Sequence, residues 1–192
     1  MVAQPPKFEP LYGKLDVDFK NNQFNSIGTK DYTINHSRGM VFENNNLKLS
    51  GDAYFELPIA EADYTQKATI QLLVEAPPTN GVIDNWFRFW TDYNVWMVFG
   101  FMSDAVINAK TPFVITFLRD NTSPTMKTYI NDVLIKTDNP SGAFRWRYWM
   151  QIGANTNQPQ PENLTIRRFR IFDRRIDESE VKHYAEEMLA NS

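Results

Sequence analysis

Short apolar or alternating runs, each bounded by Asn, Gly, Asp or Pro, follow one another along most of this chain and constrain its fold more than any other feature. From Ala68 to Glu75, apolar and polar side chains mostly alternate, as they do in a strand with one face on a core. Turn signals such as Ser50-Gly51-Asp52 separate the runs. Because parallel strands need long, usually helical crossovers, the pattern predicts antiparallel sheet packed on sheet. The predicted strands are Leu15–Phe19, Met40–Phe42, Leu47–Leu49, Ala53–Leu57, Ala68–Glu75, Trp86–Thr91, Val95–Phe101, Phe113–Arg119, Lys127–Ile130, Val133–Lys136, Phe144–Ile152 and Leu164–Phe172.

The C-terminal segment carries the one convincing helical pattern of the sequence. Asp177-Glu178-Ser179-Glu180 has the spacing of a capping box, and apolar residues recur after it at helical intervals. We therefore expect a helix over residues 178–189 that docks an apolar stripe on the sandwich. The stripe consists of Val181, Tyr184, Ala185 and Met188. Without an internal repeat or a linker, residues 12–192 are predicted to form one domain, and residues 1–11 an extended N-terminal arm.

Composition excludes several classes of protein. Aromatic residues make up 14% of the 192 residues, which favours strands. The chain contains no Cys, which excludes disulfides, thiolate metal sites and a cysteine nucleophile. Its net charge of −3 gives no overall attraction to nucleic acid or to acidic membranes. No apolar run suits a signal peptide or a membrane span, so we expect synthesis in a cytoplasm and no membrane insertion.

A set of segments in a fixed order carries a resemblance to a known superfamily. They are Leu15–Phe19, Leu47–Phe55, Ala68–Val74, Thr111–Phe117, the hairpin Met126–Ile135 with Asn131-Asp132 at its tip, and the closing strand Leu164–Ile176. The ordered set resembles the laminin-G-like members of the concanavalin A superfamily. The resemblance implies an all-β jelly-roll sandwich of two curved antiparallel sheets with a short C-terminal α-helix. It leaves function open, because this scaffold hosts lectins, glycanases, adhesion modules and structural proteins.

A glycanase site of that superfamily is incomplete in this chain. Family glycanases carry three carboxylates at alternate positions of one strand, so that two of them flank the scissile sugar bond. The nearest match begins at Glu61 and Asp63, where Thr65 or Gln66 stands in place of the last carboxylate. We therefore predict that the protein is not an enzyme and has no catalytic residues.

One group of residues has the chemistry of a calcium site. Asp84, Asp92 and Asn94 offer the oxygen ligands that Ca²⁺ prefers, as in some laminin-G relatives. They lack the rigid spacing of a dedicated calcium loop, and turn formation also accounts for them. We therefore predict neither a metal site nor a cofactor.

The run Phe144–Ile152 is the most informative for binding. Alternation places Arg145, Arg147, Trp149 and Gln151 on the face opposite the predicted core. Guanidinium groups beside an aromatic plate suit sugar rings, acidic groups or the surface of a partner protein. The alternative is that a loop covers Trp149 while the arginines cross-link neighbouring strands.

Five arginines lie near the C-terminus. A basic strand in an acidic chain more often forms surface ion pairs than a nucleic-acid site, so we expect no nucleic-acid partner. These residues are Arg167, Arg168, Arg170, Arg174 and Arg175.

The N-terminal arm leads to a hypothesis about assembly. Pro5 and Pro6 favour an extended segment, and Phe8 and Leu11 give it something to bury against a partner; a frayed tail is the alternative. We expect a lectin-like binding or assembly module on the surface of a virion, as a capsid decoration protein or a tail-associated adhesin. Its partners would be other virion proteins, its own copies in a homo-oligomer, or cell-surface glycans. The alternative is an extracellular carbohydrate-binding module, freestanding or from a secreted glycan-degrading or adhesion system.

Overall fold

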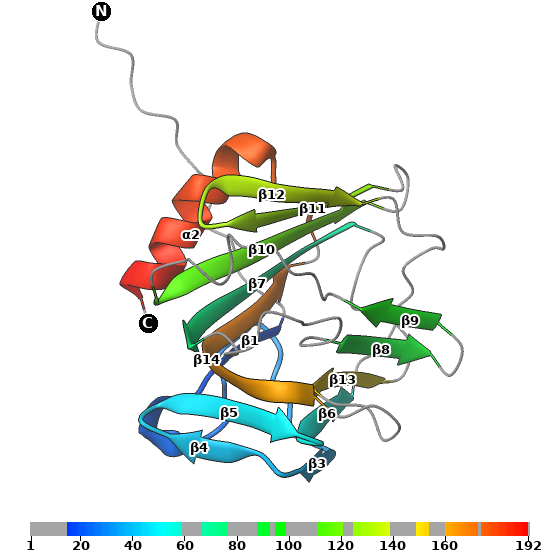
Figure 1. The fold of residues 1–192 in the computed structure, drawn as a ribbon, viewed down its shortest axis with the longest axis vertical. Helices are drawn as coiled ribbons and strands as arrows, with labels where there is room; N and C mark the ends of the chain where they lie inside the picture. Colours follow the sequence, from blue (N-terminus) through cyan, green and yellow to red (C-terminus); the bar gives the residue numbers. More distant parts are fainter. Residues whose placement is uncertain are drawn as a thin grey trace, which may run out of the picture.

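The strands of the chain form two antiparallel sheets, shown in Figure 1. This computed structural model describes residues 15–58, 67–76, 88–92, 95–98, 111–120, 125–138, 149–153, 160–172 and 174–191. Within them, the larger sheet has nine strands in the order β12-β11-β10-β7-β14-β1-β2, with β5 paired to β14 and β4 paired to β5. These strands are β1 (Leu15–Asp18), β2 (Asn25–Ser26), β4 (Val41–Glu43), β5 (Asn46–Gly51), β7 (Lys67–Ala76), β10 (Phe113–Asp120), β11 (Thr125–Ile130), β12 (Val133–Asp138) and β14 (Gln160–Phe172).

The smaller sheet has five described strands in the order β3-β6-β13-β8-β9. They are β3 (His36–Arg38), β6 (Tyr54–Pro58), β8 (Arg88–Asp92), β9 (Val95–Val98) and β13 (Trp149–Gly153). The predicted all-β antiparallel sandwich is therefore confirmed. Every strand predicted from the sequence has a counterpart, and among the described strands the sequence pattern missed the short β2 and β3.

The main core lies between the two sheets. Ile70 and Leu72 of β7 are at most 2% exposed and belong to the same buried cluster as Phe55 and Leu57 of β6. The alternation read from the sequence of β7 therefore identifies the inward-facing residues of this strand correctly.

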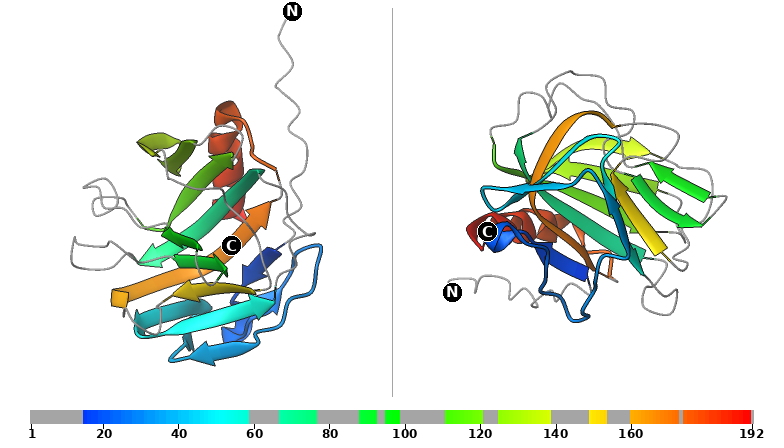
Figure 2. Two further views of the ribbon diagram at one scale, coloured as in Figure 1. Left: turned by 90° about the vertical axis from the view of Figure 1, so that its right-hand side faces the viewer. Right: turned by 90° about the horizontal axis from the view of Figure 1, so that it is seen from below.

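The other face of the larger sheet is covered by the C-terminal helix. A 3₁₀ turn, η3 (Glu178–Glu180), leads into α2 (Val181–Ala190), and no described helix is long and apolar enough to cross a membrane. Figure 2 shows α2 against the side of the larger sheet that faces away from the smaller sheet. Ala185 and Met188 form a buried cluster with Leu73 and Val114. The predicted docking of the apolar stripe is thus confirmed.

This covering layer corrects the expectation that β7 is half-buried. Thr69, Gln71 and Leu73, which point away from the main core, are all 0% exposed. The alternating pattern identifies the apolar face of a strand, and it does not reveal that the polar face is also covered.

Candidate functional site

Strand β14 changes its partner on one edge. It pairs with β5 up to Ile166, which lies opposite Leu47, and with β1 from Arg168, which lies opposite Asp18. Its other edge stays paired with β7 through the same region. Arg167 therefore lies at a break in the sheet, between the part of β14 that pairs with β5 and the part that pairs with β1.

A β-bulge lies at the same point. Ile166 is opposite Val74 of β7 and Arg168 is opposite Leu73, so Arg167 is an extra residue without a partner position. In a regular strand, consecutive side chains point to opposite faces. Here Arg167 and Arg168 line one and the same pocket.

The break in the sheet is occupied by a polar pocket of about 450 Å³, a volume within the usual range of ligand sites. We call it the β14 pocket. Its lining residues are Asp18, Lys20, Asn21, Asn44, Asn45, Arg167, Arg168 and Asn191.

Two asparagine turns form one wall of the β14 pocket. Asn21 (φ 58°) belongs to the 3₁₀ turn η1 (Lys20–Asn22), while Asn44 (φ 54°) and Asn45 (φ 60°) connect β4 to β5. Asparagine tolerates this left-handed conformation better than other residues with a side chain. The turns are joined reciprocally: the Asn21 amide N–H donates to Asn45 Oδ1 at 2.8 Å, and the Asn45 amide N–H donates to Asn22 Oδ1 at 2.9 Å.

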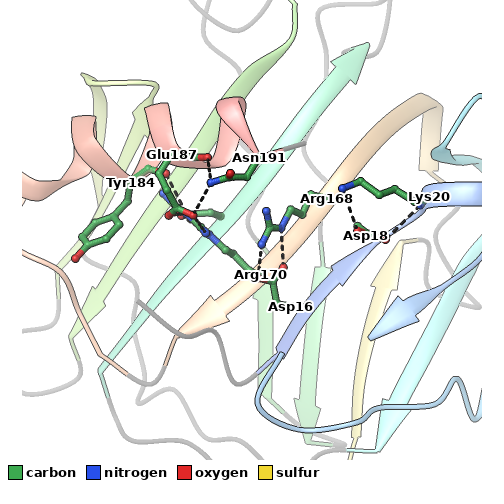
Figure 3. Close-up of polar contacts among 9 residues, drawn as sticks. Asp16, Asp18, Lys20, Arg168, Arg170, Tyr184, Glu187 and Asn191 are labelled. Carbon is green, nitrogen blue, oxygen red and sulfur yellow. Dashed lines mark hydrogen bonds and ion pairs between the residues drawn. The ribbon is translucent and has the colours of Figure 1, made fainter. Parts of the chain in front are cut away.

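Each cation of the β14 pocket has a carboxylate partner. Arg168 donates from Nε and Nη2 to the two oxygens of Asp16, at 2.8 and 2.6 Å, as Figure 3 shows. Arg167 Nη2 lies 2.6 Å from Glu75 Oε2, and Lys20 Nζ lies 3.8 Å from Asp18 Oδ2.

The environment keeps Arg168 charged. Burial lowers the pKa of this guanidinium, but the hydrogen bonds to Asp16 and the charges of Asp16, Glu187 and Asp18 together raise it above the ordinary value of an arginine. Arg168 is therefore a fixed cation, held in one orientation by a bidentate carboxylate.

A buried arginine connects the β14 pocket to the helix. Arg170 is 1% exposed and donates to Glu187 at 3.0 and 3.3 Å, to the Tyr184 carbonyl at 3.0 Å, and to Gln71 Oε1 at 2.8 Å. Asn191 Nδ2 donates to Glu187 Oε1 at 3.3 Å, so Glu187 contacts both the buried arginine and the pocket wall (Figure 3). Burial lowers the pKa of Arg170.

The arginines near the C-terminus do form ion pairs, but the expectation that these pairs lie at the surface is wrong for two of them. The Arg170 side chain is 1% exposed and that of Arg168 is 11% exposed. The helix covers the face of β14 from which both project, and this cover is not visible in the alternation of the strand.

The binding face and the arm predicted from the sequence fall mostly outside the described residues. Arg145 and Arg147 lie outside them. Trp149 and Gln151 lie in β13, where the backbone pairs with Pro58 and Glu56 of β6, and their side chains are not described. The arm residues Pro5, Pro6, Phe8 and Leu11, the incomplete carboxylate set at Glu61 and Asp63, and the calcium candidates Asp84 and Asn94 also lie outside the described residues.

The sequence analysis missed the asparagines of the β14 pocket. Paired asparagines at positions 21–22 and 44–45 were the available signal, because such pairs favour left-handed turns. Their meeting in space depends on which strands pair, and periodicity does not reveal that. Among the described residues, no cluster of three or more His, Cys, Asp and Glu side chains has the arrangement of a metal site. The pocket instead offers hydrogen-bond donors and acceptors from amides and paired charges.

No protein-family model and no curated protein sequence matches the chain. Solved structures do match it. The receptor-binding domain of the botulinum neurotoxin C/D mosaic serotype has a TM-score of 0.64 at 15% identity, covering 93% of this chain and 52% of that one. The binding domain of botulinum neurotoxin DC in complex with SialylT has a TM-score of 0.66 at 16% identity, covering 92% and 52%. The ligand-binding domain of serotype D in complex with N-acetylneuraminic acid has a TM-score of 0.61 at 14% identity, covering 93% and 51%.

These similarities show that the chain shares a β-sandwich fold with receptor-binding domains. The chain spans about half the length of the solved structures it matches. At these identities the likeness concerns the fold alone.

Proposed function

We propose that the chain is a carbohydrate-binding module without catalytic activity, and that its ligand occupies the β14 pocket. The observation that carries this proposal is the pocket itself, about 450 Å³ of space at a break in the larger sheet, whose described lining residues are all polar or charged. Sugar hydroxyls both donate and accept hydrogen bonds, and the amides and paired charges of the pocket do the same.

The structures that share the fold support a binding role. They are receptor-binding domains, and two of them are complexes with SialylT and with N-acetylneuraminic acid. A scaffold of this kind presents a sugar to fixed side chains and needs no reactive group to do so. We carry over from these structures the class of ligand, and not its identity.

The sequence also leads to proposals about the superfamily, the domain bounds and the location of the protein. We propose a laminin-G-like sandwich over residues 12–192, with residues 1–11 as a docking arm. We also propose a place on the surface of a virion, as a capsid decoration protein or tail-associated adhesin; the alternative is an extracellular module of a glycan-degrading or adhesion system. Mass spectrometry of purified particles tests the virion location, and the absence of the chain from every particle would remove it.

A glycan array with three variants tests where a sugar binds. Asn21→Gly combined with Asn44→Gly removes two pocket amides while keeping residues that accept a positive φ. Trp149→Ala removes the aromatic plate of the binding face predicted from the sequence. Asn35→Ala, an exposed asparagine next to β3 and outside the pocket, is the matched control.

We expect the wild type to bind a subset of glycans, the double variant to lose at least about tenfold in affinity, and the other two variants to keep it. Loss of binding in Trp149→Ala with full binding in the double variant would move the site to the β13 face. An array without any bound glycan would end the carbohydrate proposal.

A further inference from the structure

We infer that the β14 pocket selects an uncharged, hydroxyl-rich glycan over an acidic one, an inference that rests on the proposed function. The sugar named in one of the similar structures is acidic. The charges and hydrogen bonds of the pocket in this chain favour a different class.

The cations among the described lining residues of the β14 pocket are already paired with carboxylates. Lys20, Arg167 and Arg168 line it, and each has its own carboxylate: Asp18, Glu75 and Asp16 respectively. The Arg168 and Asp16 side chains are only 11% and 9% exposed, so this pair is screened little by water. An acidic sugar would have to compete with the fixed Asp16 carboxylate for Arg168 and would meet the negative charges of Asp18 and Glu75 beside the other two cations.

The amides of the β14 pocket are the groups with spare hydrogen-bonding capacity. Among the described residues, the side chains of Asn21 and Asn44 make no hydrogen bond, and Asn45 uses only its oxygen. Asn191 donates through Nδ2 to Glu187, which leaves its Oδ1 as an acceptor. An amide carries no net charge and presents both donor and acceptor, which matches a hydroxyl better than a carboxylate.

The wall that holds these amides is preorganised. The reciprocal hydrogen bonds between the two asparagine turns fix the backbone from which Asn21, Asn44 and Asn45 project. A site whose groups are already ordered loses less conformational entropy on binding than one that must be ordered by its ligand. The ligand therefore meets a neutral and largely fixed set of donors and acceptors.

Matched glycan pairs test the inference. An array carrying neutral oligosaccharides, each beside its sialylated and its sulfated counterpart, measures the preference directly. We expect the neutral member of a pair to bind as tightly as the acidic member or more tightly. Calorimetry with the best neutral oligosaccharide should show less than about a twofold change in affinity between low and high salt, because no net charge is neutralised on binding.

Glu75→Gln tests the role of charge pairing, because it leaves Arg167 without its carboxylate. This variant should gain about threefold to fivefold in affinity for acidic glycans, the effect of one partly exposed charge, and keep its affinity for neutral ones. Asp52→Asn, which breaks the ion pair with Arg38 outside the pocket, should gain nothing.

The outcomes separate this inference from the proposed function. Preference of the wild type for acidic counterparts by about tenfold or more, weakened by salt, would overturn the inference and leave carbohydrate binding standing. No gain for acidic glycans in Glu75→Gln would count against the charge-pairing argument. Binding of neither class by the wild type would overturn both.

Discussion

Asn45 combines a backbone and a side-chain role at one position. Its φ of 60° belongs to the left-handed region, and its Oδ1 accepts from the backbone N–H of Asn21. The side chain thus links two turns that are remote in sequence, while the backbone closes the β4–β5 hairpin. The two roles can be separated by substitution, because glycine keeps the first and alanine keeps neither.

Asn45→Ala should lower the free energy of unfolding by about 2 kcal/mol, through the left-handed strain on a Cβ and the lost acceptor. Asn45→Gly should cost about 1 kcal/mol, because it loses the acceptor and keeps the conformational freedom. Urea unfolding followed by tryptophan fluorescence measures both. Asn35→Ala serves as the control, and equal losses for alanine and glycine at position 45 would show that strain plays no part.

At the scale of single residues, the sequence predicted a residue's backbone conformation or type of interaction better than its neighbours in the fold. Asn131 was placed at the tip of a hairpin, and it does lie between β11 and β12, with a φ of 53° in the left-handed region. Arg167 and Arg168 were identified as members of ion pairs, whereas their meeting in one pocket depends on a bulge. Bulges arise from how two strands fit together, so one strand's alternation does not contain them.

The start of the helix is tied to the β11 strand. Glu178 accepts hydrogen bonds from Lys127 Nζ and, at 2.9 Å, from the Tyr129 hydroxyl. Those two hydrogen bonds lower the pKa of Glu178 below its ordinary value. Burial, together with the hydrogen bond to Glu178 and its charge, raises the pKa of Tyr129 to about 12, so the hydroxyl stays protonated well into the alkaline range.

A lowered carboxyl pKa makes stability depend on acid pH. The contribution of Glu178 is present above the pKa of the unfolded chain, roughly pH 4, and is lost as pH falls through the lower folded value. The free energy of unfolding of the wild type should therefore fall more steeply than that of Glu178→Gln between roughly pH 5 and pH 3. Urea titrations at several pH values measure both slopes, with Glu186→Gln as a control on the exposed side of α2. Parallel slopes for wild type and Glu178→Gln would contradict the role of this carboxylate.

At the scale of elements, the sequence pattern predicted the strands that contain apolar residues and missed β2 and β3. Both missed strands consist of polar residues and therefore show no alternation, whereas β4, which is as short as β3, contains Val41 and Phe42. The helix was predictable because its capping box and its apolar stripe are local signals, and Glu180 does accept from the Asp177 backbone N–H at 2.7 Å.

The whole molecule has three layers in its described part, since α2 forms a third layer on the larger sheet (Figure 2). The polar link between α2 and the sheet is Glu187 with Arg170. Because Arg170 is 1% exposed, its charge needs a compensating partner. The sequence predicted that the helix docks, but not that a buried ion pair fixes it in place.

Glu187→Ala should destabilise the protein by about 2–4 kcal/mol, because it leaves a buried guanidinium without its carboxylate. The adjacent Glu186→Ala is a matched control, since Glu186 is 65% exposed and its ion pair with Lys182 is exposed as well. Thermal and urea unfolding of both variants provide the comparison. Equal stability of the two variants would mean that water or another group compensates Arg170.

The change of partner strand along β14 has a mechanical consequence when a ligand occupies the β14 pocket. Its lining comes from residues 18, 20–21, 44–45, 167–168 and 191, which bring both ends of the described chain to one spot. A ligand bound there would contact β1, the β4–β5 hairpin, β14 and the end of α2 at once, and would hold these elements together. Fraying from either end would first have to release that molecule, so saturation would protect the C-terminal segment against proteases.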